Sequence, residues 1–196
     1  NGVGKTTIIA ALAKRLIVLG FDVFLTKEPT KSSLGEFFKT GEESYRGKCL
    51  ACIAAADRYF HIETEILPAL QSEKLVISDR YVESSLVLQR LDGCSLDFIW
   101  QLHSQIVTPD LSVVIVANPE TVKQRLIERG GSLSRFEKDE SREKELLFYR
   151  EAAEFLSQHG FNVFLIENEQ SCVNEVVDSL ISKIQGLHQK SKGDKL

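Results

Sequence analysis

The sequence lacks the marks of several large protein classes. Only four cysteines occur in 196 residues, which is too few for a disulfide framework. The 24 Lys and Arg residues are outnumbered by 28 Asp and Glu residues, and the net charge of -4 leaves no basic footprint for a nucleic acid. No apolar run approaches the length of a membrane span, and no secretory signal is visible. We therefore expect a cytoplasmic protein that has neither a nucleic acid nor a membrane as a partner.

The cysteines and histidines do not form a metal-binding pattern. Cys49 and Cys52 are spaced as a C-x-x-C pair, but they lie within a long stretch of helical character. Cys94 and Cys172 have no partner at a matching spacing, and the four histidines are scattered. A zinc site needs four convergent ligands. We interpret the cysteines as small buried side chains.

Helices and short apolar strands alternate along the chain. The spacing of apolar side chains predicts helices at about 5–19, 45–70, 83–91, 95–107, 119–129, 146–156 and 173–184, with a short one through Phe37 and Phe38. Apolar runs predict strands at 22–26, 75–77, 111–117 and 161–166. The alternation favours an α/β fold with a parallel sheet and helices on both faces. We expect one domain over 1–187 and a frayed polar tail at 188–196.

The chain begins within a glycine-rich motif. Residues 1–7 read Asn-Gly-Val-Gly-Lys-Thr-Thr, the closing part of the pattern G-x-x-x-x-G-K-[ST]. Glycines let backbone N–H groups turn inward and form, with the next helix N-terminus, a nest for phosphates. Lys5 would add positive charge beside the β- and γ-phosphates, and the Thr6 hydroxyl would ligate Mg²⁺. The predicted site for a nucleoside triphosphate comprises Gly2, Val3, Gly4, Lys5, Thr6 and Thr7.

This motif also leads us to expect a further strand before Asn1, because a phosphate loop of this kind connects a strand to a helix. A glycine-rich turn that precedes Gly-Lys-Thr by chance is the alternative. The helical spacing of Ile9, Leu12 and Leu16 after the loop argues against it.

A second charged group follows the predicted strand 75–77. Asp79 comes at the end of this buried strand, where a phosphate-loop protein places a carboxylate that organises Mg²⁺. Arg80 can hold phosphate oxygens through two parallel hydrogen bonds. An Asp that caps the next helix is the alternative, and the two roles are compatible.

Six motifs occur in the order seen in thymidylate kinases. They are the loop Gly2–Thr7, Thr26-Lys27-Glu28-Pro29, Ala56-Asp57-Arg58, Asp79-Arg80-Tyr81 with Ser84-Ser85 and Gln89, Thr108-Pro109-Asp110-Leu111, and Arg135-Phe136-Glu137. The chain thus resembles this family over nearly its whole length. The resemblance implies a three-layer P-loop NTPase fold and a phosphoryl transfer from ATP to a deoxynucleoside monophosphate, first of all dTMP. It also implies Mg²⁺ and a mobile lid at about 129–138.

Carried over by position, the resemblance assigns roles around the acceptor. Arg80 would bridge the acceptor and donor phosphates, and Glu28 would lie near Mg²⁺ and the acceptor. Arg58 would hydrogen-bond the base edge, with Ser85 and Gln89 beside the base. The implied metal-binding set is Thr6, Asp79 and Glu28.

The predicted lid would supply charge to the transition state. Val3 occupies a phosphate-loop position that is Arg in one branch of the family, so a lid arginine is expected instead. Arg135 is the first candidate and Arg129 the second, and solvated loop charge is the alternative for both. With Lys5 and Arg80, these two arginines complete the predicted catalytic set. No general base is assigned, because the acceptor phosphate is already anionic.

The sequence departs from the family around the acceptor. Where the family has an Arg, a base-stacking Phe, an aromatic residue beside the sugar and an Asp, this chain has Lys27, Ala54, Leu88 and Asn1. One interpretation is drift. The other is an altered acceptor with a larger base, a modified pyrimidine or another sugar. Thymidylate ranks first because Arg58 and Gln89 remain.

Two further functions stay open. A deoxynucleoside kinase would share the architecture and would need a carboxylate base, which Glu28 could provide. A nucleotide-binding module without transfer activity is the third hypothesis, although Arg80 has no obvious purpose in it. A homodimer is implied by the resemblance alone, and we expect the helix at 45–70 and the two helices after it to form the interface.

Overall fold

The computed structural model describes residues 2–130, 142–169 and 172–193. The four strands expected from the sequence are present, as β1 (Val23–Lys27), β2 (Leu75–Asp79), β3 (Ser112–Val116) and β4 (Val163–Glu167). All pairings are parallel: β1 pairs with β2 so that Val23 faces Leu75, and β3 pairs with β4 so that Ser112 faces Val163. The parallel arrangement confirms the α/β class, since parallel strands need helical crossovers.

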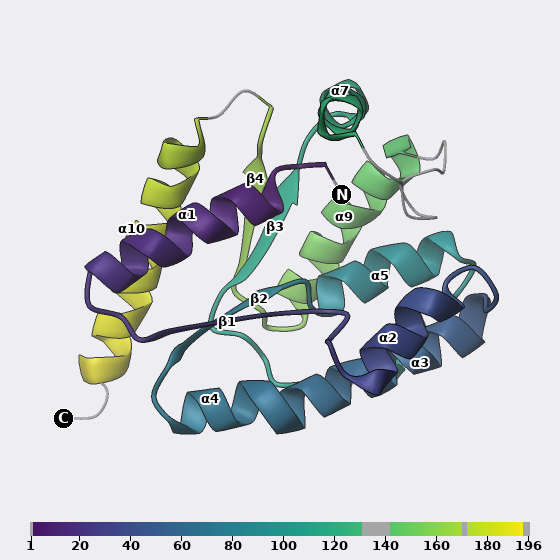
Figure 1. The fold of residues 1–196 in the computed structure, drawn as a ribbon, viewed down its shortest axis with the longest axis horizontal. Coiled ribbons are helices and arrows are strands. Elements are labelled where there is room, and N and C mark those ends of the chain that lie inside the picture. The colour runs from purple at the N-terminus through teal and green to yellow at the C-terminus, as the bar shows by residue number, and fades with distance from the viewer. Residues whose placement is uncertain (1, 131–141, 170–171, 194–196) are drawn as a thin grey trace.

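The helices follow the predicted alternation (Figure 1). They are α1 (Lys5–Val18), α2 (Ser33–Gly41), α3 (Gly47–His61), the π-helical turn η1 (Ile62–Ile66), α4 (Leu67–Gln71), α5 (Val82–Leu91), α6 (Leu96–Leu102), α7 (Pro119–Arg129), α9 (Arg142–Gln158) and α10 (Val173–Gly193). The helix predicted at 45–70 is therefore α3, η1 and α4 in succession.

Two predicted helix ends were wrong. Helix α6 ends at Leu102 rather than near residue 107. The chain leaves the helix there because Ile106 and Val107 pack into the core, and the Val107 carbonyl accepts a hydrogen bond from the Tyr81 hydroxyl. Helix α10 continues to Gly193, through most of the segment that we expected to be frayed. A ring contact between His188 and Phe21, with centroids 5.3 Å apart, holds that last part against the end of α1.

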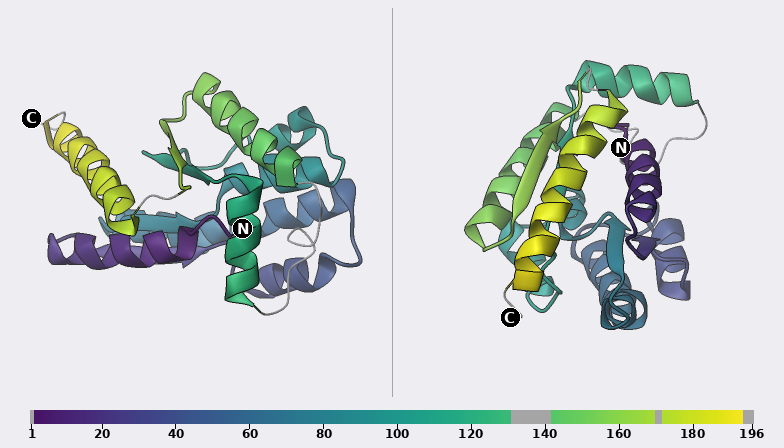
Figure 2. Two further views of the ribbon diagram at one scale, coloured as in Figure 1. Left: turned by 90° about the horizontal axis from the view of Figure 1, so that it is seen from above. Right: turned by 90° about the vertical axis from the view of Figure 1, so that its left-hand side faces the viewer.

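Side chains of the strands alternate between two helical layers, as the predicted parallel sheet requires. Leu75 and Ile77 of β2 face a core cluster formed with α1 and α10, whereas Val76 between them faces a second cluster formed with α3, α5 and α6. In β3, Ile115 belongs to the first cluster, and Val114 packs with α9. Figure 2 shows α10 and α9 on opposite sides of β3 and β4. The fold therefore has three layers.

Within the described part of the chain, the four strands form two separate two-stranded sheets. A cavity of about 780 Å³ lies between β2 and β3, and Ile8 and Leu12 of α1 contribute to its apolar lining. It extends to Lys5 and Arg80, at the carboxyl ends of the strands.

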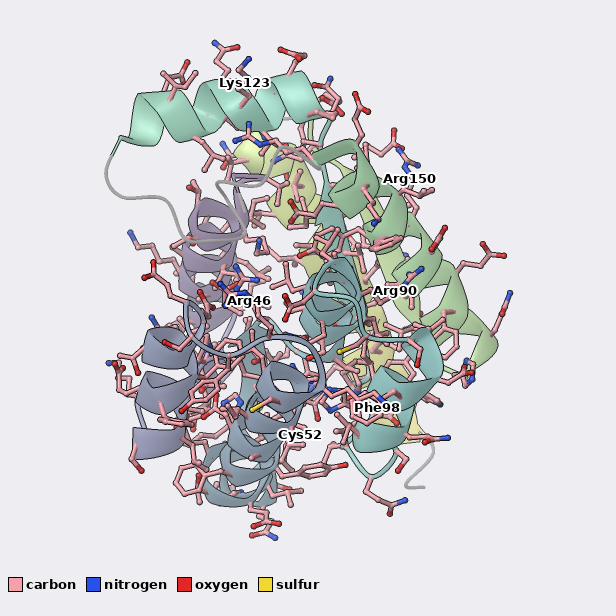
Figure 3. All side chains as sticks on the ribbon, turned by 90° about the vertical axis from the view of Figure 1, so that its right-hand side faces the viewer. Arg46, Cys52, Arg90, Phe98, Lys123 and Arg150 are labelled. Carbon is pink, nitrogen blue, oxygen red and sulfur yellow. The ribbon has the colours of Figure 1, made fainter. Side chains whose placement is uncertain are left out.

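The interpretation of the cysteines was wrong for three of the four. Cys49, Cys52 and Cys172 are exposed, and only Cys94 is buried. Cys49 and Cys52 lie on the outward face of α3, where Figure 3 labels Cys52. The helical spacing around them was read correctly, but not which side of the helix faces the core. Within the described residues, no His, Cys, Asp and Glu side chains gather into a three-membered metal-binding group.

None of the helices in residues 2–130, 142–169 and 172–193 has both the length and the apolar character needed to cross a membrane.

Candidate active site

The phosphate loop has the backbone shape that its glycines permit. Gly2 and Gly4 have φ angles of 78° and 92°, which L side chains rarely adopt. Gly4 is the N-cap of α1, and no side chain forms a capping hydrogen bond there in the described part of the chain. The first N–H groups of a helix have no partner within the helix, so the start of α1 can receive an anion.

Asn168 holds this loop in place and was not found from the sequence. It follows β4 directly, its side-chain Nδ2 donates to the Val3 carbonyl at 2.7 Å, and its backbone N–H donates to the Val116 carbonyl at 2.8 Å. A Cβ atom on Gly4 would come within 3.0 Å of Nδ2. The signal that could have identified Asn168 is its place after an apolar strand, at the sheet edge where the other polar groups lie.

The acid and the arginine after β2 meet the phosphate loop at one cavity. Asp79 is the last residue of β2, and Asp79, Arg80 and Lys5 all line the cavity between the sheets. Arg80 has a φ of 82°, an uncommon left-handed conformation for a residue other than glycine. The Ser78 hydroxyl donates to the Arg80 carbonyl at 2.8 Å and supports this turn. Strained backbone that is held by neighbours is found preferentially at functional sites.

Tyr149 of α9 is hydrogen-bonded to the Arg80 side chain. Burial raises the pKa of its hydroxyl to about 12, although the positive charge of Arg80 acts in the opposite direction. The hydroxyl therefore stays protonated at neutral pH. The contact between Tyr149 and Arg80 therefore connects α9, the helix that follows the predicted lid, to the predicted catalytic residue Arg80.

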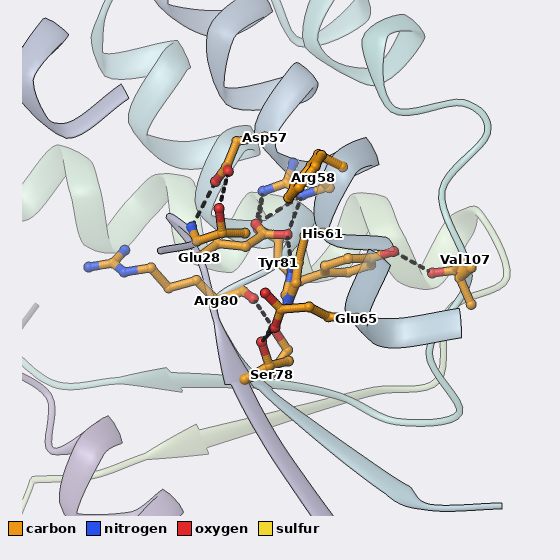
Figure 4. Close-up of polar contacts among 12 residues, drawn as sticks. Glu28, Asp57, Arg58, His61, Glu65, Ser78, Arg80, Tyr81 and Val107 are labelled. Carbon is orange, nitrogen blue, oxygen red and sulfur yellow. Dashed lines mark hydrogen bonds and ion pairs between the residues drawn. The ribbon is translucent and has the colours of Figure 1, made fainter. Parts of the chain in front are cut away.

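A buried ion pair brings together two of the residues predicted at the acceptor. Glu28 follows β1 and is 8% exposed, and Arg58 of α3 is 3% exposed. Arg58 Nη2 donates to Glu28 Oε2 at 2.6 Å, and Arg58 Nε donates to the same oxygen at 3.0 Å (Figure 4). Ser85 of α5 accepts from Arg58 Nη1 at 2.8 Å. The structure thus joins Glu28, Arg58 and Ser85.

Glu28 remains ionised despite its burial. Desolvation acts to raise the pKa of its carboxyl, but the charge of Arg58 and hydrogen bonds from His61 and Arg58 together bring this pKa below its usual value. His61 Nδ1 lies 3.3 Å from Glu28 Oε1, and Nε2 lies 2.6 Å from the Thr26 hydroxyl, which donates to Glu65 at 2.6 Å. His61, which is fully buried, was not singled out from the sequence.

Asp57, beside Arg58 on α3, fixes the loop that follows Glu28. Its Oδ2 accepts from the Thr30 N–H at 2.9 Å, and its Oδ1 accepts from the Thr30 hydroxyl at 2.5 Å and from the Ser32 hydroxyl at 3.4 Å. Ser32 in turn caps α2 by accepting from the Gly35 N–H. Two adjacent residues of one helix therefore hold successive parts of the loop between β1 and α2.

The remaining residues considered at the acceptor site differ in their exposure to solvent. Gln89 of α5 is 2% exposed, and its Oε1 has no hydrogen-bond partner among the described residues. Ala54 and Leu88 are partly buried, whereas Lys27 is exposed. No described hydrogen bond joins Gln89 to the group around Arg58.

The predicted lid falls mostly outside the described residues. Arg135 belongs to the segment 131–141 and Asn1 to the chain start, so both lie outside the description. Arg129 is the last residue of α7, and its side chain is likewise not described. The assignment of the lid arginine stays a prediction.

Two of the three predicted metal ligands fit a magnesium ion. Asp79 Oδ1 is buried and has no hydrogen-bond partner within the described residues, and Thr6 is an exposed residue in the first turn of α1. Mg²⁺ bound with nucleotide phosphates typically takes only one or two protein ligands, so a larger cluster is not needed. Glu28 fits less well, because both of its oxygens already accept hydrogen bonds from Arg58.

Comparisons with known proteins agree with this geometry. The sequence model of the family described as Thymidylate kinase matches residues 1–180. A protein named probable thymidylate kinase in Caldivirga maquilingensis is 31% identical over 198 residues, covering 98% of this chain and 92% of that protein. Proteins with the same name in Pyrococcus abyssi and Pyrococcus horikoshii are 33% and 37% identical, covering 94% and 70% of this chain and 92% and 71% of their own lengths.

Proposed function

Because this chain belongs to the thymidylate kinase family, we propose that it transfers the γ-phosphoryl group of ATP to the phosphate of dTMP. The family consists of phosphotransferases with a P-loop NTPase fold, so the fold predicted from the sequence is confirmed. The observation that carries the proposal is the family match over residues 1–180, in a chain whose Lys5, Asp79 and Arg80 line one cavity.

ATP would bind with its phosphates at the N-terminus of α1. The proposed contacts are the backbone of Gly2, Val3 and Gly4, the Lys5 ammonium and the first turn that contains Thr6 and Thr7. Asn168 keeps the loop in shape through its hydrogen bond to the Val3 carbonyl. Oriented N–H groups stabilise phosphate charge without reorganising during the reaction.

Magnesium would be held by the Thr6 hydroxyl and by Asp79 Oδ1, which has no hydrogen-bond partner among the described residues, with Glu28 nearby as the third predicted residue. The ion neutralises charge on the phosphates when it is bound. The protein's own contribution at this point is the Asp79 carboxylate, which lines the cavity.

Arg80 would bridge the donor and acceptor phosphates during an in-line transfer. Its guanidinium neutralises charge on the transferring group, and its hydrogen bond with Tyr149 limits the orientations it can take. An arginine from the lid, Arg135 first and Arg129 second, would complete this charge. No general base is required, because the acceptor oxygen is already anionic.

A monophosphate acceptor is favoured over a nucleoside by the state of Glu28. A nucleoside kinase needs a carboxylate that accepts a proton from a hydroxyl. The pKa of Glu28 is lowered and its oxygens are held by Arg58, so it is a weak base.

The buried Gln89 Oε1, which lacks a partner among the described residues, is free to accept a hydrogen bond from the N–H of a pyrimidine base.

We further propose a single cytoplasmic domain over 1–187 that forms a homodimer. Exposed apolar side chains along the segment 45–70, which we expect to form the interface with the two helices after it, support this proposal, since Tyr45, Phe60 and Leu70 are 38%, 39% and 39% exposed. Light scattering at micromolar concentration would give the mass of a dimer, and a monomer mass would contradict this part of the proposal.

The activity is tested by ADP release with ATP and Mg²⁺ against dTMP, dUMP, dCMP, dAMP, dGMP, their ribose counterparts and thymidine. Turnover of dTMP in preference to the others supports the proposal. Turnover of another monophosphate would mean that Ala54 and Leu88 alter the acceptor pocket, and turnover of thymidine alone would identify a nucleoside kinase. No turnover with intact ATP binding would identify a binding module.

A matched pair of variants ties the activity to the phosphate loop. Lys5→Ala removes the proposed phosphate contact, and Lys14→Ala removes an exposed lysine from the same helix. ADP release should fall by orders of magnitude only in Lys5→Ala. Equal effects of the two changes would argue against the proposed site.

A further inference from the structure

The guanidinium of Arg58 has all five of its N–H groups engaged within the protein. Nε and one N–H of Nη2 bind Glu28, and the second N–H of Nη2 donates to the Tyr81 carbonyl at 2.9 Å. Nη1 donates to the Ser85 hydroxyl at 2.8 Å and lies 2.9 Å from His103 Nε2. Arginine carries five donors and no acceptor. A base that bound Arg58 directly would have to displace one of these partners.

Arg58 therefore acts here as an internal connection among four chain segments. Its partners come from the ends of β1 and β2, from α5 and from the residue that ends α6. Glu28 depends on it most directly, because two of the five N–H groups point to the Glu28 carboxylate. The orientation of this guanidinium therefore contributes to that of the Glu28 carboxylate, whose Oε1 also lies 3.3 Å from His61 Nδ1.

His103 is the partner that nothing in the sequence pattern indicated. It follows the last turn of α6, its backbone N–H donates to the Trp100 carbonyl at 2.9 Å, and its side chain is 1% exposed. Both ring nitrogens lie close to the same Arg58 atom, Nε2 at 2.9 Å and Nδ1 at 3.3 Å from Nη1. Since Nη1 can only donate, the imidazole must present a lone pair and be neutral. Burial, and next the charge of Arg58, lower the pKa of His103 to about 2, in agreement with this geometry.

The two ends of the guanidinium have different supports. Glu28 holds the Nε–Nη2 edge, and Ser85 and His103 hold Nη1. Loss of the imidazole would leave one buried, charged N–H without an acceptor, and such a group is costly. The guanidinium would rotate or admit water to satisfy it, and either change moves the edge that holds Glu28.

We propose that His103 is a positioning residue for the acceptor site, which acts by fixing the Arg58 guanidinium and, through it, the Glu28 carboxylate. This inference rests on the proposed function in one respect, namely that Glu28 lies beside the acceptor. The contacts among His103, Arg58 and Glu28 are independent of what the acceptor is.

The first test compares three variants by steady-state kinetics with dTMP and ATP. His103→Leu removes the acceptor, His103→Gln returns a side-chain oxygen to its place, and His159→Leu makes the same change at an exposed histidine of the α9–β4 turn. We expect His103→Leu to raise the KM for dTMP about tenfold, with the KM for ATP changed less than twofold. His103→Gln should recover most of the loss. His159→Leu removes ring contacts with Trp100 and Phe155 and should therefore lower the melting temperature, but it should leave both KM values unchanged.

A purely structural role for His103 would look different. Both KM values would stay constant in the His103→Leu variant while the melting temperature fell, or His103→Gln would fail to recover the KM for dTMP. Either result would overturn the proposal.

A second test does not depend on catalysis. A double-mutant cycle of unfolding free energy with His103→Leu and Glu28→Gln measures whether these two residues, which share no hydrogen bond, are coupled through Arg58. Non-additive effects support the proposal even if the protein phosphorylates no monophosphate, in which case only the proposed function fails. Additive effects would overturn the inference whatever the activity is.

Discussion

Replacing Asp57 by alanine should destabilise the protein and loosen the loop that carries Glu28. The Asp57 carboxylate is 2% exposed and accepts two close hydrogen bonds from Thr30, at 2.9 and 2.5 Å. Hydrogen bonds to a charged group contribute about 1.5–3 kcal/mol each, and the relief of a buried charge offsets part of their loss. We expect a decrease of about 3 kcal/mol in the free energy of unfolding, of the size seen when buried hydrogen-bond networks are broken.

The measurement is thermal and urea unfolding of Asp57→Ala beside Asp178→Ala. Asp178 is the matched control, because its ion pair with Arg15 is at the surface, where the Asp178 side chain is 59% exposed. Such pairs contribute about 0–1 kcal/mol. For a chain of this size, 1 kcal/mol corresponds to about 2–4 °C in Tm, so Asp57→Ala should melt about 6–12 °C lower.

Steady-state kinetics of Asp57→Ala distinguish a local change at the acceptor site from a general loss of stability. Below its melting temperature, Asp57→Ala should show a raised KM for dTMP, because the segment from Glu28 to Ser32 loses its attachment to α3. Its KM for ATP should not change, since the phosphate loop is held from β4 by Asn168. If Asp57→Ala melted within 2 °C of Asp178→Ala, the reasoning about this carboxylate would be refuted.

Three further outcomes are expected. The His103 imidazole has an ordinary pKa of 6.5 in the unfolded chain and a pKa of about 2 in the folded protein, so the free energy of unfolding is highest above pH 6.5 and falls as the pH decreases, by up to about 1.4 kcal/mol per pH unit. His103→Gln should flatten this dependence in urea unfolding, and an unchanged slope would contradict the prediction. Arg80→Lys should lower kcat on the order of 10³-fold at unchanged Tm, and a kcat within tenfold would remove Arg80 from the transition state. Gly4→Ala should raise the KM for ATP at least tenfold, since its Cβ would meet Asn168 Nδ2 at 3.0 Å. The control is Gly20→Ala, because Gly20 has a similar φ of 89° but open space around it, and this change should lower only the free energy of unfolding. Equal KM values for ATP in the two variants would exclude an effect on the phosphate loop.

The elements that could be predicted are those with a local signal. Lys5 is recognised from its immediate neighbours in a glycine-rich motif, and Asp79 from its place after a short apolar run. The parallel sheet follows from the alternation of strands and helices, which limits the topologies available. Such signals depend only on neighbouring residues and not on the position of the segment in the fold, so the amino-acid sequence is sufficient to predict the role of these residues.

The residues that were missed have their partners far along the chain. His103 meets Arg58 from 45 positions away, and Asn168 meets Val3 from 165 positions away. No spacing rule connects residues at such separations. The environment of Arg58 shows the same limit, since its position was predicted, but its full set of internal partners could be seen only after folding.

The phosphate loop, the order of strands and helices, and the charged residues at the strand ends could be predicted from the amino-acid sequence, because each depends on a few consecutive residues. Which hydrogen-bond donors and acceptors remain available to a substrate could be seen only in the folded protein. Arg58 is committed to Glu28, Ser85, Tyr81 and His103, while Asp79 and Gln89 each keep a buried oxygen without a partner among the described residues. Whether a buried polar atom is satisfied depends on every segment packed around it, and those segments come together only in the folded chain.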